Sequence, residues 1–116
     1  MNYKKKLKQQ YKEMKPSMGV FIIKNNVNGK AFLGVSNDTK SIINRHRFQL
    51  QWGGHPIKEL QQDWEKYGED AFTIEVLEYL EYDKKEEKVD YSEELEILKI
   101  MWIDKLNEDD KLQLYN

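Results

Sequence analysis

The apolar positions of this chain recur with periods that predict four helices and three strands. Over residues 1–15 they are spaced by four, four and three residues, which is one face of a helix, and Pro16 ends it. That face consists of Tyr3, Leu7, Tyr11 and Met14. The other positions are rich in lysine, so we expect a basic arm that packs on the domain, on a second copy of the chain or along DNA.

A β-hairpin is predicted after the arm. Residues 18–24 and 30–35 are both rich in β-branched and aromatic side chains, as strands usually are. Between them, Asn28-Gly29 is a strong signal for a tight hairpin turn. We therefore expect two antiparallel strands joined near this pair.

Two helices are predicted next, and each ends at glycine. The first begins after a capping Asp38 or Asn37 and runs to about residue 51, before a pair of glycines. The second has Pro56 in its first turn. Gly68 follows it, at a position where a left-handed residue is favoured.

A third strand and a last helix complete the pattern. Apolar and polar residues alternate over residues 71–80, which is typical of a strand, and residues 81–90 are expected to form a charge-rich loop. Asp90 followed by Glu93 resembles a capping box at the start of the last helix. The residues of that helix that are available for burial are Leu95, Leu98, Met101, Trp102 and Ile103.

The order helix-strand-strand-helix-helix-strand-helix predicts an α+β fold, with a small three-stranded antiparallel sheet covered by helices. At 116 residues the chain is expected to form one domain at 18–116, preceded by the basic arm at 1–17. It has no cysteine, which excludes disulfides and thiolate metal sites. Its apolar stretches are too short for a membrane span and no signal peptide is evident, so we expect a cytoplasmic protein.

Charge is distributed unevenly along the chain. Residues 1–74 carry 13 Lys and Arg against 7 Asp and Glu, whereas residues 75–116 carry 6 against 14. These counts give net charges of +6 and −8, which together return the net charge of −2. A basic front half attracts phosphate and an acidic rear half repels it, so we expect any nucleic acid to bind on one side.

The best candidate for a nucleic-acid surface lies in residues 40–58. Lysine and arginine contact phosphates, and an exposed aromatic ring can stack on an unpaired base. The residues of that surface are Lys40, Arg45, Arg47, Trp52 and Lys58. A solvated helix face has the same composition, which leaves both interpretations open.

Two glycine-containing triplets give the chain a resemblance to a known family. Gly19-Val20-Phe21 stands where GIY-YIG nucleases have Gly-Ile-Tyr, and Phe32-Leu33-Gly34 stands where they have Tyr-Ile-Gly. Further matches at the family's spacing are residues 28–30, Ser36, Asp38, His46, residues 66–72, Trp102-Ile103, Leu106-Asn107 and Tyr115-Asn116. The matches span about residues 18–116, and their joint order makes the chain similar to this family.

The resemblance implies an activity and a set of roles. Nucleases of this family hydrolyse DNA phosphodiesters with one divalent metal ion. The tyrosines of both triplets act at the nucleophile or hold the attacking water. An arginine on the first helix of the domain stabilises charge on the phosphate, and a histidine four residues later lies on the same face. A glutamate on the last helix binds the metal, and a late asparagine supports the site. The corresponding positions here are Phe21, Phe32, Ile42, His46, Lys99 and Asn116, with His55 as a further polar residue.

Most of these positions lack the chemistry that the resemblance implies. Phenylalanine has no hydroxyl to hold a water, and isoleucine cannot stabilise the charge that develops on phosphate. An ammonium about 4 Å from a divalent ion would repel it by roughly 8 kcal/mol at an effective dielectric of 20. We therefore expect neither catalysis nor a metal cofactor. The alternative is a relocated Mg²⁺ site built on Arg45 and Glu96, which lie one helical turn from Ile42 and Lys99.

Several of these residues also have purely structural interpretations. The two phenylalanines and Ile42 are expected in the core, and His46 is expected as a buried, hydrogen-bonded histidine. His55 follows two glycines, as an exposed loop residue would. Lys99 is either a helix-surface lysine or an ammonium that replaces the metal and binds phosphate directly.

Three functions remain open from the sequence. The first is a catalytically degenerate protein of the nuclease fold that binds nucleic acid or acts as a regulatory module. The second is an active endonuclease whose site uses Arg45 and Glu96. The third is a protein-interaction or dimerisation module that uses the apolar face of the basic arm.

Overall fold

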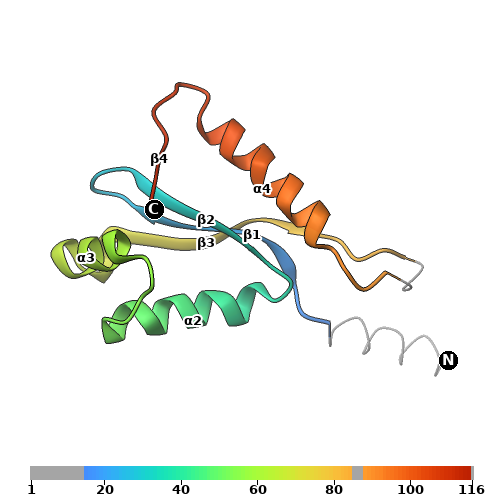
Figure 1. The fold of residues 1–116 in the computed structure, drawn as a ribbon, viewed down its shortest axis with the longest axis horizontal. Coiled ribbons are helices and arrows are strands. Elements are labelled where there is room, and N and C mark those ends of the chain that lie inside the picture. The colour runs from blue at the N-terminus through green and yellow to red at the C-terminus, as the bar shows by residue number, and fades with distance from the viewer. Residues whose placement is uncertain (1–14, 85–87, 116) are drawn as a thin grey trace, which may run out of the picture.

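The computed structural model describes residues 15–84 and 88–115, and Figure 1 shows a sheet with helices on both of its faces. In chain order its elements are β1 (Met18–Asn25), β2 (Lys30–Ser36), α2 (Thr39–Trp52), α3 (Lys58–Tyr67), the 3₁₀ turn η1 (Glu69–Ala71), β3 (Phe72–Leu80), α4 (Ser92–Leu106) and β4 (Gln113–Leu114). The predicted α+β class is confirmed. The predicted contact residues of the basic arm lie outside the described residues; they are Tyr3, Leu7, Tyr11 and Met14. Asn116 lies outside them too.

β1 is a central strand of the sheet, whose order is β3-β1-β2-β4. It pairs antiparallel with β2 through the predicted hairpin, and Gly29 in the turn has a φ of 78°, which favours glycine. On its other edge β1 pairs antiparallel with β3, with a bulge between Val20 and Phe21. Gly19 has no room for a side chain at this pairing, because a Cβ atom would collide with the carbonyl oxygen of Glu78.

Successive residues of β1 point to opposite faces of the sheet and build two cores. Phe21 and Ile23 face α2 and α3, and their cluster contains buried residues of both helices. Val20 and Ile22 face α4. The residues of α4 that pack against this second core are Leu98, Trp102, Ile103 and Leu106. Burial on both faces explains why β1 is an unbroken apolar run and not an alternating pattern.

The sheet has four strands, so the prediction of three was wrong. β4 is two residues long and runs parallel to the start of β2, with Lys30 opposite Gln113 and Ala31 opposite Leu114. The backbone N–H of Tyr115, which follows β4, donates to the carbonyl oxygen of Ala31 at 2.9 Å. Two exposed residues carry no strand pattern, so contacts in the tertiary structure decide this strand.

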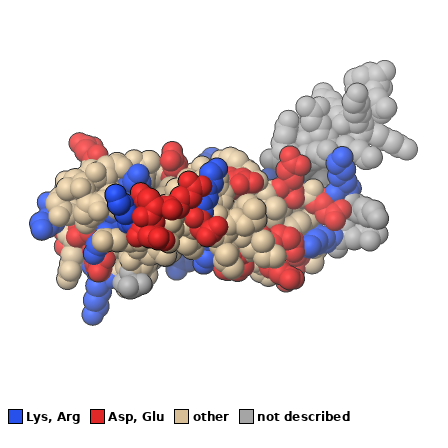
Figure 2. Space-filling view, turned by 90° about the horizontal axis from the view of Figure 1, so that it is seen from above, with Lys and Arg blue, Asp and Glu red and all other residues tan. Residues whose placement is uncertain are grey.

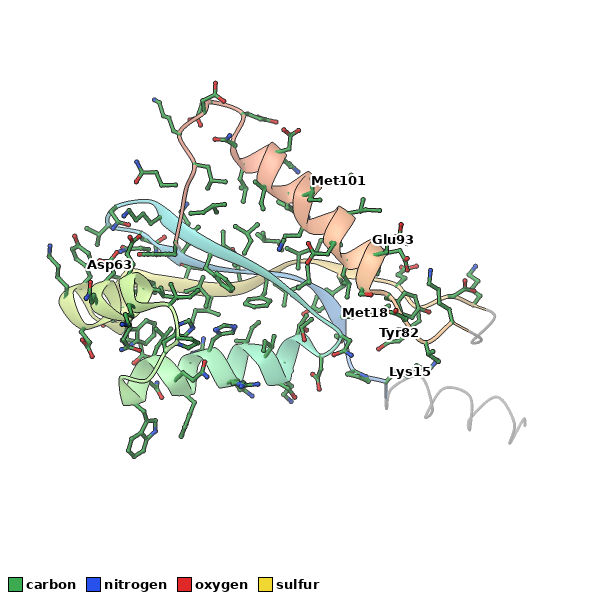
Figure 3. All side chains as sticks on the ribbon, viewed as in Figure 1. Lys15, Met18, Asp63, Tyr82, Glu93 and Met101 are labelled. Atoms are coloured by element: carbon green, nitrogen blue, oxygen red, sulfur yellow. The ribbon has the colours of Figure 1, made fainter. Side chains whose placement is uncertain are left out.

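Tyr115 anchors the C-terminal segment through a buried polar cluster. Its hydroxyl donates to Oδ2 of Asp63 at 2.7 Å and accepts from Nδ2 of Asn25 at 3.1 Å. Asn25 is fully buried, and Figure 3 shows Asp63 on α3, close to the C-terminal segment. Burial acts to raise the pKa of Asp63, but hydrogen bonds from Tyr115, Asn28 and Asn25 outweigh it and hold the pKa below its ordinary value. The cluster therefore joins β1, α3 and the end of the chain.

The start of α4 and the surroundings of α3 differ from the predictions. Asp90 does not cap α4: the N-cap is Tyr91, and Oδ1 of Asp90 accepts from the N–H and the hydroxyl of Ser92 at 3.0 and 2.6 Å. Pro56 lies before α3 and not in its first turn. Gly68 has a φ of 87° but a ψ of 161°, which is outside the left-handed helical region.

The predicted bounds of α2 are confirmed. Asp38 caps it by accepting from the backbone N–H of Ser41 at 3.2 Å. Gly53 ends it in the left-handed conformation, with its N–H donating back to the last turn. These two caps fix the start and end of the helix that carries most of the candidate site.

α4 carries apolar residues on its outer side as well. Met101 was predicted to be available for burial but is 61% exposed, and Figure 3 shows it on the side of α4 away from the sheet. Ile97 and Ile100 are also exposed. The prediction for Met101 was wrong because α4 has apolar residues around most of its circumference. The spacing of its apolar residues therefore does not indicate which face is buried. Among residues 15–84 and 88–115, no helix has both the length and the apolarity that a bilayer crossing needs.

Replacing Tyr115 with phenylalanine keeps the ring in its core but removes the hydroxyl from the Asp63–Asn25 cluster. Because one of its hydrogen bonds is to a carboxylate, we expect the free energy of unfolding at pH 7 to fall by about 1.5–3 kcal/mol. Urea denaturation measures the change. Tyr79→Phe is the matched control, since that side chain is exposed on β3 and its change should be under about 0.5 kcal/mol. Equal losses in the two variants would contradict the anchoring role of Tyr115.

Candidate functional site

Three aromatic rings from three elements meet on the α2 side of the sheet. Phe21 of β1 is buried and Phe32 of β2 is half-buried, and their ring centroids lie 6.0 Å apart. His46 of α2 packs against both, with its ring centroid 5.3 Å from that of Phe21 and 5.5 Å from that of Phe32. Ile42, one helical turn before His46, packs against the same core. The structure thus brings four predicted site positions together, and three of them contribute only hydrocarbon.

Gly34 of β2 makes room for this cluster. A Cβ atom at Gly34 would lie 2.6 Å from the ring of Phe21 and 3.2 Å from the ring of Phe32. Any side chain there would push the two phenylalanines apart. The glycine of each triplet is therefore required for steric reasons. At Gly19 the missing side chain lets β3 approach β1, and at Gly34 it leaves space for the rings of Phe21 and Phe32.

His46 is joined to His55 by a hydrogen bond between ring nitrogens. Nδ1 of His46 and Nε2 of His55 lie 2.8 Å apart. Nδ1 of His55 accepts from the backbone N–H of Ile57 at 3.0 Å, so that nitrogen carries no proton. The proton of a neutral His55 is then on Nε2, from which it is donated to Nδ1 of His46. This assignment leaves the proton of a neutral His46 on its Nε2.

His55 was expected as an exposed loop residue, and that expectation was wrong because the side chain is buried. Its backbone N–H donates to Oε1 of Gln61 at 3.0 Å, and Nε2 of Gln61 donates to the carbonyl oxygen of Leu50 at 3.0 Å. Gln61 of α3 thereby ties the loop after α2 to the end of that helix. The sequence does not reveal this contact, since a helical glutamine carries no signal of the loop that it binds.

Both histidines are neutral at pH 7. Burial, together with the neighbouring His55 and Arg45, lowers the pKa of His46 to about 4. Burial also lowers the pKa of His55. A proton added to Nδ1 of either ring would face another N–H group, because each Nδ1 already accepts a hydrogen bond. The pair is therefore a neutral, hydrogen-bonded unit and not a cation that faces phosphate.

Lys99 lies on α4, which packs on the opposite face of the sheet from α2. Its ammonium nitrogen lies 3.4 Å from Oε2 of Glu96, one turn earlier on the same helix. The metal site that the resemblance implies needs a carboxylate at position 99 to hold a divalent cation. Lysine brings a positive charge there, and the neighbouring carboxylate of Glu96 is paired with that lysine. The residues at this place do not fit a metal ion.

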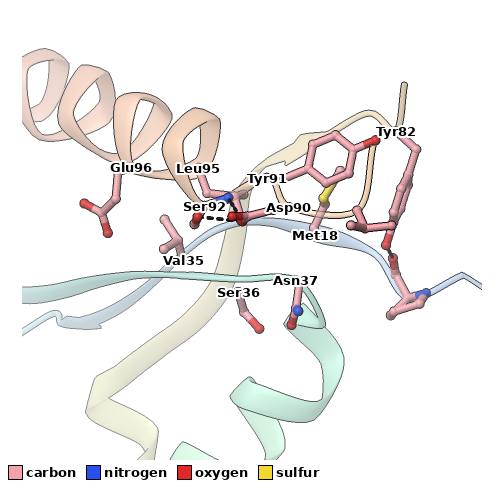
Figure 4. A pocket seen from close by; sticks show the side chains of 12 residues that line it. Met18, Val35, Ser36, Asn37, Tyr82, Asp90, Tyr91, Ser92, Leu95 and Glu96 are labelled. Carbon is pink, nitrogen blue, oxygen red and sulfur yellow. Dashed lines mark hydrogen bonds between the residues drawn. The ribbon is translucent and has the colours of Figure 1, made fainter. Parts of the chain in front are cut away.

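The structure does not bring the alternative pair, Arg45 and Glu96, into one site. Glu96 lines a cavity of about 430 Å³ together with Ser36, Asn37 and Tyr91 (Figure 4). Arg45 is not part of this cavity and lies on the solvent side of α2. Within the described ranges 15–84 and 88–115, no three His, Asp or Glu side chains gather as they would around a metal ion.

α2 carries the predicted basic surface on its solvent side. Lys40 and Arg45 are exposed, Arg47 is half-buried, and Lys58 is exposed at the start of α3. In the described part of the chain none of the four forms an ion pair, whereas three other lysines are paired with glutamates. α2 itself contains no Asp or Glu. These cations are therefore available to an anionic ligand.

Trp52, the aromatic member of the predicted surface, is 75% exposed near the end of α2. Its ring centroid lies 5.7 Å from that of Phe48, which is 60% exposed. Phe48 was not among the residues predicted for this surface. The signal was its spacing of four residues from Trp52, which places both rings on one side of a helix.

The face of the molecule on the α4 side is acidic. Figure 2 views this face and shows Asp and Glu in patches across it, with Lys and Arg between them. The acidic residues of α4 are Glu93, Glu94, Glu96 and Asp104. The uneven charge along the chain thus becomes a difference between two faces, with the cations of α2 on one and the carboxylates of α4 on the other.

Comparison with known proteins supports the family resemblance, although no protein-family model matches the sequence. The sequence is similar to intron-associated endonuclease 1 of Enterobacteria phage T4, with 33% identity over 66 residues, which is 57% of this chain. Those residues are 26% of the relative, so the chain matches about a quarter of its length.

Two solved structures share the fold. The catalytic domain of homing endonuclease I-TevI matches with a TM-score of 0.62 and 27% identity, over 84% of this chain and 96% of that domain. A mutant of the catalytic domain of intron endonuclease I-TevI matches with the same TM-score and identity, over 86% of this chain and 92% of that one.

The I-TevI catalytic domain is a small α+β domain of the GIY-YIG type, and these similarities place the fold of this chain in the same class. The chain is therefore a GIY-YIG-like domain with the nuclease fold, as the triplets and their spacing predicted. At the positions where the resemblance expects two tyrosines, an arginine and a glutamate, this chain has Phe21, Phe32, Ile42 and Lys99.

The free energy of unfolding is expected to fall as the pH drops from 7 to 5. The chain has two histidines and both belong to the pair, so their titration governs this range. The folded-state pKa of His46 is about 4, against 6.5 for an ordinary histidine. The unfolded chain therefore binds more protons between these values, and acidification favours unfolding. We expect a loss on the order of 1–2 kcal/mol, measured by urea denaturation at each pH.

His46→Phe is the matched variant for this measurement, because a phenylalanine ring suits the cluster with Phe21 and Phe32. It removes one of the two titrating rings, so its stability should change less between pH 7 and pH 5 than that of the parent chain. A parent chain whose stability did not depend on pH in this range would contradict the neutral pair.

Proposed function

We propose that this domain binds nucleic acid without cleaving it. The observation that carries the proposal is the hydrocarbon cluster of Phe21, Phe32 and Ile42 around His46, at positions where the resemblance expects reactive groups. Neither phenylalanine can hold an attacking water, and Ile42 offers no charge to a phosphate. Lys99 replaces the metal-binding carboxylate, so water positioning, charge stabilisation and metal binding are all affected.

The charge of α2 supports nucleic acid as the ligand. Lys40, Arg45 and Arg47 have no carboxylate partner among the described residues, so phosphate binding breaks no existing ion pair. The acidic residues of α4 would repel the same ligand from the other face. Similarity to a phage endonuclease makes DNA the first ligand to test.

A plasmid-nicking assay tests the absence of cleavage. Supercoiled plasmid incubated with the purified protein and Mg²⁺ or Mn²⁺ is expected to remain supercoiled, because the loss of even one charge-stabilising donor costs about 100- to 1000-fold in rate. Metal-dependent nicking that disappears in a Glu96→Gln variant would overturn the proposal. That result would assign an active, relocated site to this chain.

A binding assay tests the basic surface. We expect the double variant Arg45→Ala/Arg47→Ala to bind labelled DNA about 10-fold or more weakly, because two phosphate contacts are lost. The slope of log affinity against log salt should fall by about two, one for each lost contact. Fluorescence anisotropy at several salt concentrations measures both quantities.

Lys105→Ala/Lys111→Ala is the matched control for this assay. It removes the same charge from exposed positions at and after the end of α4, so its affinity should stay within about 2-fold of the parent chain. Equal losses in the two double variants would show an effect of net charge alone and would contradict the assignment to α2.

A further inference from the structure

Two large aromatic side chains lie open to solvent at the end of α2. Phe48 is 60% exposed and Trp52 is 75% exposed, with ring centroids 5.7 Å apart and ring planes tilted by 39°. The other tryptophans are used within the fold: Trp64 is buried against Phe72, and Nε1 of Trp102 donates to Glu78 at 2.8 Å. Packing among residues 15–84 and 88–115 leaves both rings of the Phe48–Trp52 pair mostly exposed, so a role in the core does not explain them.

A cation adjoins this aromatic pair. Arg45 precedes Phe48 by three residues and Trp52 by seven, a spacing that puts all three on one row of the helix. The row is about 10 Å long at the rise of an α-helix. Glu65 of α3 lies near Gly53 at the end of the row, and its carboxylate accepts a hydrogen bond from Gln61. The row combines aromatic faces with a guanidinium that forms no ion pair with any residue that the structure describes.

Exposed aromatic rings beside a cation favour nucleic acid with unpaired bases over a base-paired duplex. In a duplex each base is stacked between its neighbours, so an aromatic side chain reaches its face only by unstacking a base step, which costs free energy. An unpaired base exposes that face, and stacking on an aromatic ring is tolerant of sequence. A guanidinium next to the rings can hold the phosphate that joins two such bases. The positive charge of α2 favours this ligand over an apolar protein surface, which needs no cation.

We propose that the Arg45–Phe48–Trp52 row is a stacking site for unpaired bases, so that the preferred ligand of this domain is single-stranded nucleic acid or a strand with unpaired bases. This inference rests on the proposed function and names its ligand class. The rings take one or two bases, and Arg45 contacts the phosphate backbone beside them.

Binding of a labelled thymine homopolymer, compared with a blunt duplex of the same length, tests the inference. We expect Phe48→Ala/Trp52→Ala to weaken binding of the single strand about 10-fold or more and to change duplex affinity by less than about 2-fold. Trp52→Phe should retain most single-strand affinity, since a ring remains. Tyr79→Ala removes an exposed aromatic from β3 and is the matched control, with no expected change in either affinity.

Intrinsic fluorescence provides an independent readout. Stacking of a base on Trp52 should quench its emission when the thymine homopolymer is added, and the quenching should be absent in Trp52→Phe. Trp64 and Trp102 remain in that variant and supply the reference signal.

The outcomes separate this inference from the function on which it rests. If no nucleic acid binds, the proposed function itself fails. If DNA binding depends on Arg45 and Arg47 but is unchanged in Phe48→Ala/Trp52→Ala, the stacking site alone is wrong. Loss of self-association in that aromatic variant, with DNA binding unchanged, would assign the rings to contact with a second copy and would equally overturn the inference.

Discussion

The antiparallel pairing of β1 with both β2 and β3 is the constraint on which the rest of the domain depends. Because β1 is hydrogen-bonded on both edges and buried on both faces, its alternating side chains decide which helix lies where, with Phe21 facing α2 and Val20 facing α4. The pairing also requires two glycines. Gly19 allows β3 to approach, and Gly34 leaves space for the ring of Phe21. The two triplets that mark the family are therefore first of all requirements of packing.

Packing alone accounts for the residues found at Phe21 and Ile42, two of the positions that the resemblance marks. Phe21 and Ile42 stabilise the domain by burial, worth about 1.5–3 kcal/mol for a fully buried apolar side chain. A buried hydroxyl or guanidinium would need a partner to offset the cost of leaving water. The remaining polar residues of the cluster satisfy each other, because His46 and His55 form a neutral pair closed by the N–H of Ile57. Phe21, Phe32 and Ile42 therefore belong to the core on the α2 side of the sheet.

The surface is organised differently, since charge separates its two sides. α2 presents cations that form no ion pair within the described part of the chain, together with an exposed pair of rings. α4 presents carboxylates around exposed apolar residues. A polyanion that approaches from the α2 side meets attraction close to the surface, where salt screens it least. The same ligand is repelled from the α4 side. The proposed binding surface and the core thus lie in separate parts of the molecule, and a surface variant can test binding without disturbing the fold.

The sequence by itself determined the long strands, the helices and the glycine turns, because apolar runs, Asn-Gly pairs and capping residues act over a few neighbouring positions. It also determined which residue types stand at the positions that the resemblance marks, since that requires only residue identity at a given spacing. Only the tertiary structure decided how distant residues meet. Tyr115 reaches Asp63 across 52 positions and thereby creates β4, and the His46–His55 bond crosses a loop whose closure depends on Gln61 of another helix. The exposure of Met101 and Phe48 was likewise decided by packing, because local periodicity does not specify which side of a helix the rest of the chain covers.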